Sequence, residues 1–471
     1  MLCAVPSAIP GQIVDGRVID IRANPPRAIL QNLVQQSEHF IRPVCKYFEA
    51  CGGCKTQHLQ YSVQAVNKEN VVKKLMNSFE CEVSPIQVPG IESGLFKYRN
   101  KMEFTCSTGR WLIKEDIGAV DSEMPANFTL GLFPKTNSRR RWDGRVLAIK
   151  SCWLQEDIGN RVLEALWTEN ALQKVEAYDH LKHTGLLKNV MIRIGTSKWG
   201  EKEVMIGFGT SRIDRLALEP IVTAFLENLN EDDRACVVSI INYMDEESKR
   251  RYQKQLKSEG KNDIVSETQI NIQGQGYIHD TILDKEFQLS LRSFFQPNTA
   301  QASVLYSSIR DICANFYQNH NRRPVVWDLF CGVGSIGICV ADECELVIGI
   351  DIVDAAITDA KQNAEYNSLS NKMQFICSDL TAKDQVDVLA SLIRPDIVIV
   401  DPPRPGLSTK LCNFIQQDIA PAQICYVSCN PLTQARDLQY FDEKYTISLC
   451  QPVDMLPHTP HLENIILLTR R

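Results

Sequence analysis

The C-terminal third of the chain alternates between apolar and amphipathic segments. Five short apolar runs, rich in β-branched residues, read as strands at residues 325–330, 346–352, 373–380, 396–403 and 423–431. A helix-like apolar stretch follows the first run, and an amphipathic segment follows the second. This alternation is typical of a doubly wound α/β domain with a mostly parallel sheet. We expect such a domain over residues 291–471, with ligands at the carboxyl ends of its strands.

The first half of the chain has a less regular pattern. Short alternating strands are expected at 188–195, 203–209 and 235–243, with a helix at 155–173. This mixture predicts an α+β central domain over residues 45–290. Residues 12–24 resemble one strand of a small β-module within residues 1–44, which is too short to bury a core by itself.

Composition narrows the class of protein. The chain has 471 residues, 44% of them apolar and 23% charged, which is ordinary for a soluble globular protein of about three domains. No apolar stretch reaches the ~20 residues of a membrane helix. The N-terminus lacks a positively charged start and is interrupted by Pro6 and Pro10, so we expect no signal peptide and a cytoplasmic location. No long apolar segment indicates an interface, so we expect a monomer with no obligate protein partner and no membrane contact.

Charge is unevenly distributed along the chain. The net charge is −6, yet residues 1–150 carry 20 Lys and Arg against 14 Asp and Glu. A basic first third suits a polyanionic partner. Two basic stretches, 135–145 with Trp142 and 248–257 with Tyr252, combine cations with a ring that can stack on a base. Such stretches are equally typical of a solvated surface.

Three of the 17 cysteines form a compact motif. An odd number of cysteines in a cytoplasmic protein argues against structural disulfides. Cys45, Cys51 and Cys54 follow the spacing C-x5-C-G-G-C, which brings three thiols to one centre. Cys152, in SCWLQ, is the candidate fourth ligand. The spacing fits zinc and an iron–sulfur cluster equally well.

A glycine-rich turn follows the first C-terminal strand, in DLFCGVGSIG at 328–337. Such a turn lets a ligand approach the backbone and the start of the next helix. Asp351 ends the second strand and is placed to bind ribose hydroxyls, Asp379 follows the third and is placed near an adenine, and Asp401 follows the fourth. The pattern D-x-F-x-G-x-G resembles motif I of class I S-adenosylmethionine (SAM) methyltransferases more closely than the dinucleotide pattern G-x-G-x-x-G. SAM is therefore favoured over NAD.

A thiol and a carboxylate lie near the same expected sheet edge. Pyrimidine C5 is a weak nucleophile, so its methylation needs a thiolate that adds to C6 and a base that removes the C5 proton. Cys429 ends the fifth strand, and Glu463 precedes an apolar strand that can return to the sheet. An isolated Cys-Asn-Pro is more often a buried core thiol, but Asp401-Pro-Pro-Arg one strand earlier favours catalysis. His458 and His461 are expected to position this segment rather than to bind metal.

Several motifs together resemble one enzyme family. They are RPVCKYFEACGGCKTQHLQY, KYRNKMEF, SFFQPN, DLFCGVGSIGI, DPPRPGL, YVSCNPLTQARDL and HTPHLENIILL, which cover the chain from about residue 41 to its end. They resemble the RNA (uracil-C5)-methyltransferases, in particular the iron–sulfur branch that methylates uridine in 23S ribosomal RNA. Many members begin with a complete TRAM domain, a small RNA-binding β-barrel. Only its second half, from about AIPGQIVDGRV, has a counterpart here.

The resemblance implies roles for individual residues. Cys429 would be the nucleophile and Glu463 the base. The ligands of a [4Fe–4S] cluster would be Cys45, Cys51, Cys54 and Cys152. Contacts to SAM are implied for six residues: Gln296, Phe330, Ser335, Asp351, Asp379 and Asp401. Phe294 and Phe295 would shape the pocket of a flipped-out uracil, or serve as core aromatics, and Arg99 and Lys101 would contact RNA.

Four other functions compete with methylation of 23S ribosomal RNA. The cluster cysteines favour the ribosomal substrate over the T-loop uridine of transfer RNA. A 5-methylcytosine enzyme would resemble a Pro-Cys after the fourth strand, where this chain has Pro-Pro-Arg. A non-catalytic RNA-binding or RNA-folding factor would not need Cys429 and Glu463 together. Nothing in the sequence requires an iron–sulfur redox sensor.

Overall fold

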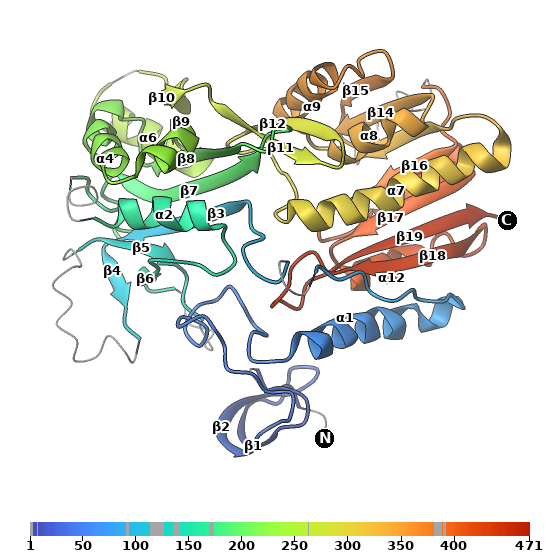
Figure 1. Ribbon diagram of the computed structural model, residues 1–471, viewed down its shortest axis with the longest axis horizontal. Coiled ribbons are helices and arrows are strands. Elements are labelled where there is room, and N and C mark those ends of the chain that lie inside the picture. The colour runs from blue at the N-terminus through green and yellow to red at the C-terminus, as the bar shows by residue number, and fades with distance from the viewer. Residues whose placement is uncertain are drawn as a thin grey trace.

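Two large β-sheets and a small N-terminal ribbon organise the chain (Figure 1). The computed structural model describes residues 3–6, 8–90, 94–113, 127–135, 142–168, 174–261, 263–380, 389 and 392–471. The ribbon pairs β1 (Ile13–Asp20) with β2 (Arg27–Gln35) in antiparallel orientation, which confirms the strand expected near residue 12. Most of its side chains are exposed, as expected for a module without its own core. Of the basic stretch 135–145, residues 136–141 lie outside the described part.

The C-terminal sheet has seven strands in the order β15-β14-β13-β16-β17-β19-β18. Its strands are β13 (Val325–Leu329), β14 (Leu346–Asp351), β15 (Met373–Cys377), β16 (Ile397–Val400), β17 (Gln423–Ser428), β18 (Tyr445–Val453) and β19 (Glu463–Arg470). The first five are parallel, and β19 inserts antiparallel between β17 and β18. The predicted doubly wound sheet is confirmed.

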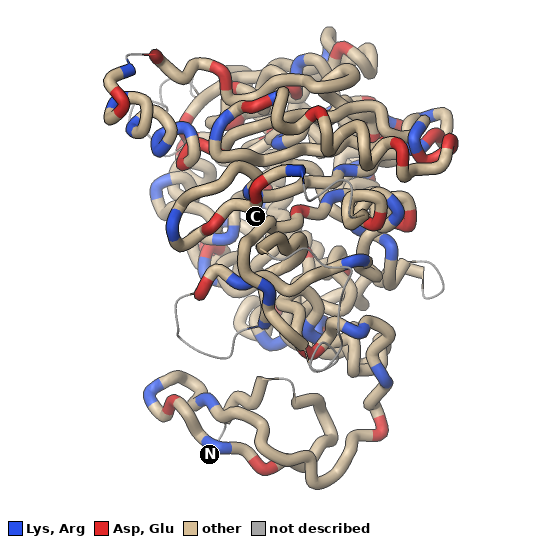
Figure 2. The backbone as a smooth tube through the Cα atoms, turned by 90° about the vertical axis from the view of Figure 1, so that its left-hand side faces the viewer, with Lys and Arg blue, Asp and Glu red and all other residues tan. Residues whose placement is uncertain are grey.

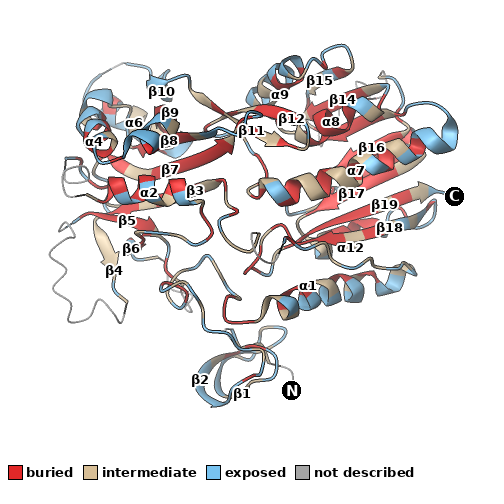
Figure 3. Cartoon of the chain, viewed as in Figure 1, coloured by how far each residue is buried: buried red, intermediate tan, exposed pale blue. Residues whose placement is uncertain are grey.

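Helices cover both faces of this sheet (Figures 1 and 3). They are α7 (Thr299–His320), α8 (Ser335–Val340), η3 (Ala341–Glu343), α9 (Asp354–Tyr366), α11 (Thr409–Asn413), η4 (Phe414–Ile419) and α12 (Pro431–Leu438). Strand β16 shows why the apolar runs predicted strands correctly. Its Ile397 and Ile399 join one core cluster, and its Val398 and Val400 join the other. A strand buried on both faces is apolar at every position.

The central domain is a mixed eight-stranded sheet in the order β10-β9-β8-β7-β3-β5-β6-β4. Its strands are β3 (Lys101–Ser107), β4 (Gly109–Trp111), β5 (Thr129–Leu132), β6 (Arg145–Ala148), β7 (Leu187–Thr196), β8 (Lys202–Thr210), β9 (Val237–Tyr243) and β10 (Gln269–Gly274). Its helices are α2 (Asp157–Leu166), α4 (Arg215–Glu227), α5 (Glu231–Cys236) and α6 (Glu246–Ser258). The α+β expectation and the three predicted strands are confirmed.

Helix α2 is shorter than the sequence predicted. It ends at Leu166 rather than 173, and residues 169–173 lie outside the described part. The indole of Trp167 donates a hydrogen bond of 2.7 Å to the carbonyl of Ile149, so the chain is anchored to the sheet directly after the last turn.

A β-hairpin and a helix lie between or beside the two sheets. The hairpin of β11 (Tyr277–Ile282) and β12 (Lys285–Ser290) lies between them, and helix α1 (Tyr61–Met76), followed by η1 (Asn77–Phe79), lies along the C-terminal sheet (Figure 1). Val72 and Met76 of α1 are fully buried in the core that also holds Trp327 and Ile348. The N-terminal half of the chain therefore contributes a helix to the C-terminal body. Among the described residues, no helix is long and apolar enough to cross a membrane.

Candidate active site

Cys429 and Glu463 lie at the ends of two adjacent antiparallel strands. The register of β17 and β19 pairs Ser428 with Asn464. Cys429 directly follows Ser428 and Glu463 directly precedes Asn464, so both residues lie at the same end of this strand pair. After burial, the charge of Glu463 is the largest cause that raises the pKa of Cys429, so the two side chains are close enough to interact. The structure thus brings together the thiol and the carboxylate that the sequence singled out, across an intervening segment of more than thirty residues.

A buried amide network fixes these strand ends. The side-chain amide of Gln434, on α12, donates to the backbone carbonyls of Tyr426 and Asn464 at 2.9 and 3.1 Å. The Asn464 amide donates in return to the Gln434 side-chain oxygen at 2.8 Å. Both amides are completely buried, where a satisfied polar network favours a single geometry. Cys429 and Glu463 are therefore held on rigid elements.

The charges around this pair control its protonation. Burial raises the pKa of Glu463 well above its ordinary value, the neighbouring Asp401 raises it further, and Arg404 opposes the shift. Glu463 is 8% exposed, and its Oε2 has no hydrogen-bond partner among the described residues. Burial, followed by Glu463 and Asp401, also raises the pKa of the half-buried Cys429, and Arg404 again lowers it. The four side chains thus act on one another as a single electrostatic unit.

Arg404 was not singled out by sequence reasoning, although it ends the quoted Asp401-Pro-Pro-Arg motif. Its backbone carbonyl accepts hydrogen bonds from the side chains of Asn430 and Thr433, each at 3.2 Å. These bonds connect the loop after β16 to the turn that carries Cys429. The carboxyl of Asp401 is itself buried, which raises its pKa to about 7.

The glycine-rich turn forms an open backbone surface beside this unit. Phe330, Gly332 and Gly334 adopt φ values of 65°, 54° and 78°, so the chain reverses sharply before α8. The Gly332 amide donates to the Asp351 carboxylate at 2.9 Å, which ties the turn to the end of β14. A Cβ atom built on Gly332 meets no atom of the described part of the chain within 4 Å, so these residues leave space open at this backbone. A ligand can approach it closely.

Asp328 is a second residue that sequence reasoning missed, although it begins the quoted motif. One oxygen accepts from the Gly337 amide at 2.9 Å, while the other, Oδ1, is buried without a partner among the described residues. Burial raises the pKa of Asp328 to about 7. An orphaned acceptor beneath a glycine-rich turn fits a site that receives hydrogen-bond donors from a ligand.

The chain is similar in sequence to a family of RNA-modifying enzymes. Residues 251–471 match the family described as tRNA (Uracil-5-)-methyltransferase. Uncharacterized RNA methyltransferases are similar over the whole chain. That of Porphyromonas gingivalis is 32% identical over 478 residues, covering 100% of this chain and 96% of the relative. That of Bacteroides thetaiotaomicron is 31% identical over 483 residues, covering 99% and 96%. The chain belongs to the RNA (uracil-C5)-methyltransferase family.

A solved structure confirms the fold of this methyltransferase. The crystal structure of the Pyrococcus abyssi tRNA (uracil-54, C5)-methyltransferase in complex with S-adenosyl-L-homocysteine aligns with a TM-score of 0.68 at 24% identity. The alignment covers 99% of this chain and 95% of that one. The predicted class I SAM-methyltransferase fold is therefore confirmed, and the protein is a SAM-dependent RNA methyltransferase.

The other predicted cofactor residues of the methyltransferase lie along the same edge. Ser335 begins α8, and its hydroxyl is 3.0 Å from that of the buried Tyr306. Asp379 follows β15 and is half-buried, and Gln296 is buried just before α7. Ser335 and Asp379 follow strands of the C-terminal sheet, whereas Gln296 lies in the segment between β12 and α7. The contacts of all three residues to SAM stay a prediction.

The two phenylalanines before Gln296 have different environments. Phe295 is buried in the core against Phe287, with ring centroids 5.4 Å apart. Phe294 is 69% exposed. Of the two, only Phe294 is free to contact a base, while Phe295 has the surroundings of a core aromatic.

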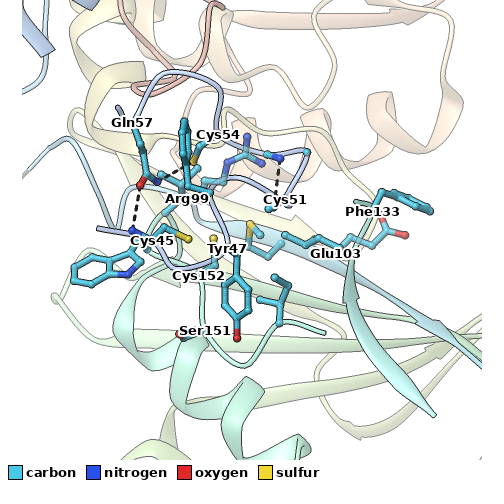
Figure 4. A pocket seen from close by; sticks show the side chains of 18 of the residues that line it. Cys45, Tyr47, Cys51, Cys54, Gln57, Arg99, Glu103, Phe133, Ser151 and Cys152 are labelled. Atoms are coloured by element: carbon cyan, nitrogen blue, oxygen red, sulfur yellow. Dashed lines mark hydrogen bonds between the residues drawn. The ribbon is translucent and has the colours of Figure 1, made fainter. Parts of the chain in front are cut away.

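The four predicted cluster cysteines line one cavity of about 460 Å³ (Figure 4). Burial raises the pKa of all four thiols, to about 11 for Cys45 and about 12 for Cys54. Cys152 raises the pKa of the other three by repulsion, so the distant cysteine has reached the loop. Within the described residues, no three Cys, His, Asp or Glu side chains form a group that holds a metal ion.

Arg99 and Lys101, which were expected to contact RNA, line this cavity as well. Arg99 lowers the pKa of Cys51 and Cys152 through its positive charge. Burial and the neighbouring Arg193 lower the pKa of Lys101 to about 8. Arg99 therefore acts on two of the thiols, Lys101 shares the lining of the cavity, and RNA contact stays a prediction for both.

Hydrogen bonds connect the cysteine loop to the segment before Glu463. The amides of Lys55 and Thr56 donate to the carbonyl of His458 at 2.8 and 3.2 Å, and the Tyr98 hydroxyl donates to Pro457 at 3.0 Å. The His458 ring stacks on Phe96 at 4.4 Å, and burial lowers its pKa to about 4. This neutral, packed histidine agrees with the positioning role expected for it.

Proposed function

We propose that this methyltransferase methylates uridine at C5 in RNA, with 23S ribosomal RNA as the favoured substrate. The observation that carries the proposal is that Cys429 and Glu463 lie at the same end of the β17–β19 strand pair, where each is influenced by the charge of Asp401, near the open glycine-rich turn. A nucleophile and a base on one rigid edge are the two groups that C5 methylation of a pyrimidine requires.

Cys429 and Glu463 act in successive steps of the reaction. The Cys429 thiolate forms a bond to uracil C6, which makes C5 an enolate carbon able to attack a methyl group. Bound SAM supplies that methyl group as an electrophilic sulfonium. The Glu463 carboxylate then removes the C5 proton, and the electron pair released from that C–H bond re-forms the C5–C6 double bond and expels Cys429. The Arg404 guanidinium favours the anionic forms of both residues.

The cofactor site follows the carboxyl edge of the sheet. Asp351 is the last residue of β14, Asp379 lies two residues after β15, and Asp401 directly follows β16. Phe330 and Ser335 bracket the glycine-rich turn. The open space at Gly332 and the unpartnered Asp328 Oδ1 support a ligand here. We assign the SAM contacts to these residues together with Gln296.

We further propose a [4Fe–4S] cluster at Cys45, Cys51, Cys54 and Cys152. Each iron of such a cluster takes one thiolate, so its ligands stand farther apart than the four sulfurs of a single zinc ion, which lie 2.3 Å from one centre. Four cysteines around a cavity fit the wider arrangement. Two sulfurs also accept hydrogen bonds, Cys54 from the Gln57 amide at 3.2 Å and Cys51 from the Gly53 amide at 3.4 Å. Such bonds tune a cluster's potential.

The proposal is tested by tritium release from RNA labelled at uracil C5. Ribosomal and transfer RNA that lack 5-methyluridine are incubated separately with SAM and the protein. We expect release from ribosomal RNA, its loss in Cys429→Ala, and its retention in Cys377→Ala, a control at the exposed cysteine that ends strand β15 at the edge of the same sheet. No release from either RNA would overturn the proposed chemistry and favour an RNA-binding factor.

Transfer RNA is the second candidate substrate. The matching family is described by its action on tRNA, and the aligned Pyrococcus abyssi enzyme acts on uracil 54 of tRNA. Release from transfer RNA alone would keep the mechanism and overturn the ribosomal assignment.

A further inference from the structure

Helix α6 is a strongly basic element that the catalytic site does not use. It carries five cations, Lys249, Arg250, Arg251, Lys254 and Lys257, against two glutamates in its first turn. Only Ser248 and Leu256 of its thirteen residues are buried, so core packing does not account for its composition. In a protein of net charge −6, such a local concentration of positive charge attracts a polyanion that the whole molecule repels.

Most of this charge is available to a ligand. Arg251 pairs with Glu247 at 2.7 Å, but Lys249, Lys254 and Lys257 form no ion pair with any carboxylate of the described residues. Residues three and four apart on a helix are neighbours about 5–6 Å apart. Arg250, Lys254 and Lys257 therefore form a row of cations with a spacing close to that of successive phosphates in a nucleic-acid strand.

Two cavities adjoin helix α6. A cavity of about 530 Å³, which we call the α6 hollow, is lined by cations, hydroxyls and rings: Tyr178, His183, Ser211, Arg212, Arg251, Tyr252 and Lys254 among them. A second cavity of about 370 Å³ is lined by six residues of α6: the four cations Lys249, Arg250, Lys254 and Lys257, together with Glu246 and Gln253. Lys254 lines both, so the two form one continuous basic surface over the helix. Cations beside aromatic rings are the combination that binds phosphates and stacks bases.

This surface lies far from the catalytic pair. Helix α6 occupies the outer flank of the central domain, while Cys429 and Glu463 lie on the C-terminal sheet (Figure 1). The view from that side shows Lys and Arg at several places along the backbone, with Asp and Glu between them (Figure 2). An RNA that contacts both places must extend beyond the stem-loop that contains the methylated uridine.

We propose that α6 and the α6 hollow form a second RNA-binding surface, which holds the phosphate backbone of substrate RNA at a distance from the methylated uridine. The proposal rests on the proposed function, because it takes the substrate to be a long structured RNA. It predicts that affinity for long RNA, but not for a short stem-loop, depends on the α6 lysines.

The test compares two double variants with equal loss of charge. Lys254→Ala/Lys257→Ala removes two cations of α6, and Lys73→Ala/Lys74→Ala removes two exposed lysines from the last turn of α1. Kd is measured by filter binding, across a range of KCl concentrations, for a long ribosomal RNA fragment and for its target stem-loop. Thermal melting checks that both variants fold.

We expect the α6 variant to bind the long RNA roughly tenfold more weakly, with the slope of log affinity against log salt reduced by about 1.4–1.8. Stem-loop binding and the α1 variant stay at wild-type values. Cross-linking of the long RNA to the peptide containing Tyr252 is expected in addition. Competition of inorganic phosphate alone, with no cross-link and no change in RNA affinity, would show a small-anion site and overturn the proposal.

Failure of this inference is distinguishable from failure of the proposed function. If the wild-type protein releases tritium from RNA but the two double variants bind long RNA alike, the α6 surface is not an RNA site and the chemistry stands. If the wild type releases no tritium, the chemistry fails, and the binding comparison still decides whether α6 contacts RNA.

Discussion

A buried ion pair anchors the segment that carries Glu463, and its removal gives a sharp prediction. Lys68, on α1, donates to the Asp454 carboxylate at 2.6 Å, and the two side chains are 5% and 0% exposed. Lys68 also donates to the carbonyl of Leu456 at 3.2 Å, and Tyr61 donates to Asp454 at 2.8 Å. This arrangement fastens α1 to residues 454–456, directly before the loop that leads to Glu463.

Lys68→Met removes the cation and leaves the Asp454 carboxylate buried with neutral donors alone. Removing one partner of a buried ion pair lowers the free energy of unfolding by about 3–5 kcal/mol. Methionine has nearly the helix propensity of lysine, so the helix itself is little affected. For a unit of roughly 150–250 residues, each kcal/mol lowers Tm by about 2–4 °C, so we expect a drop of roughly 6–20 °C.

The assay is thermal unfolding of the wild type, Lys68→Met, the double variant Lys68→Met/Asp454→Asn, and a surface control. The double variant removes the uncompensated charge and is expected to regain part of the lost stability. Lys73→Met is the matched control, because Lys73 forms an exposed i,i+4 pair with Glu69 at 2.7 Å, a type worth about 0.2–0.5 kcal/mol. Equal Tm values for Lys68→Met and Lys73→Met would refute the reasoning.

Three further predictions concern the active site and the cysteine cavity. Glu463→Gln is expected to accumulate a covalent protein–RNA adduct on denaturing gels, because proton removal follows methyl transfer; an absence of adduct would exclude this order. The rate of adduct formation is expected to rise with pH toward the raised pKa of Cys429. Arg404→Ala removes a charge that lowers this pKa, so the rise is expected at higher pH in the variant. An unchanged pH profile would contradict the electrostatic role of Arg404. Cys54→Ser is expected to lose the visible absorbance of a cluster in protein purified without oxygen, whereas Cys236→Ser, outside the cavity, keeps it.

The parallel part of the C-terminal sheet was predictable because its strands are buried on both faces. Strand β16 reads as an uninterrupted Ile-Val-Ile-Val, and β14 as a similar run that ends at Asp351. Each strand delivers its polar residue to the same edge, so Asp351, Asp379 and Asp401 followed from strand order alone. Short-range sequence pattern was sufficient here.

The pairing of Cys429 with Glu463 has a different origin. It depends on β19 entering the sheet antiparallel between β17 and β18, and no local pattern specifies which neighbour a strand chooses. The sequence showed an apolar strand able to return to the sheet, but the register that brings these two residues to the same end of the strand pair is a property of the tertiary structure.

Helix α1 was beyond sequence reasoning for a related reason. Its sequence is polar, and its buried positions include Lys68, whose partner Asp454 is 386 residues away along the chain. A lysine in a polar helix reads as solvated unless its distant carboxylate is known. The same limit applies to Arg404 and Asp328, which stand in quoted motifs but acquire their meaning from burial and from neighbours on other strands.

The segment 454–463 therefore receives support from two directions. Helix α1 holds Asp454 through Lys68 and Tyr61, while the amides of Lys55 and Thr56, directly after Cys54, hold the carbonyl of His458. His458 itself has a φ of 63°, a conformation that surrounding contacts must maintain in a residue other than glycine. Since Glu463 lies five residues farther along the same backbone, the conformation of the cysteine loop is coupled to the position of the base. We therefore expect the cysteine loop to support the position of the proposed base through these hydrogen bonds, without any electron transfer.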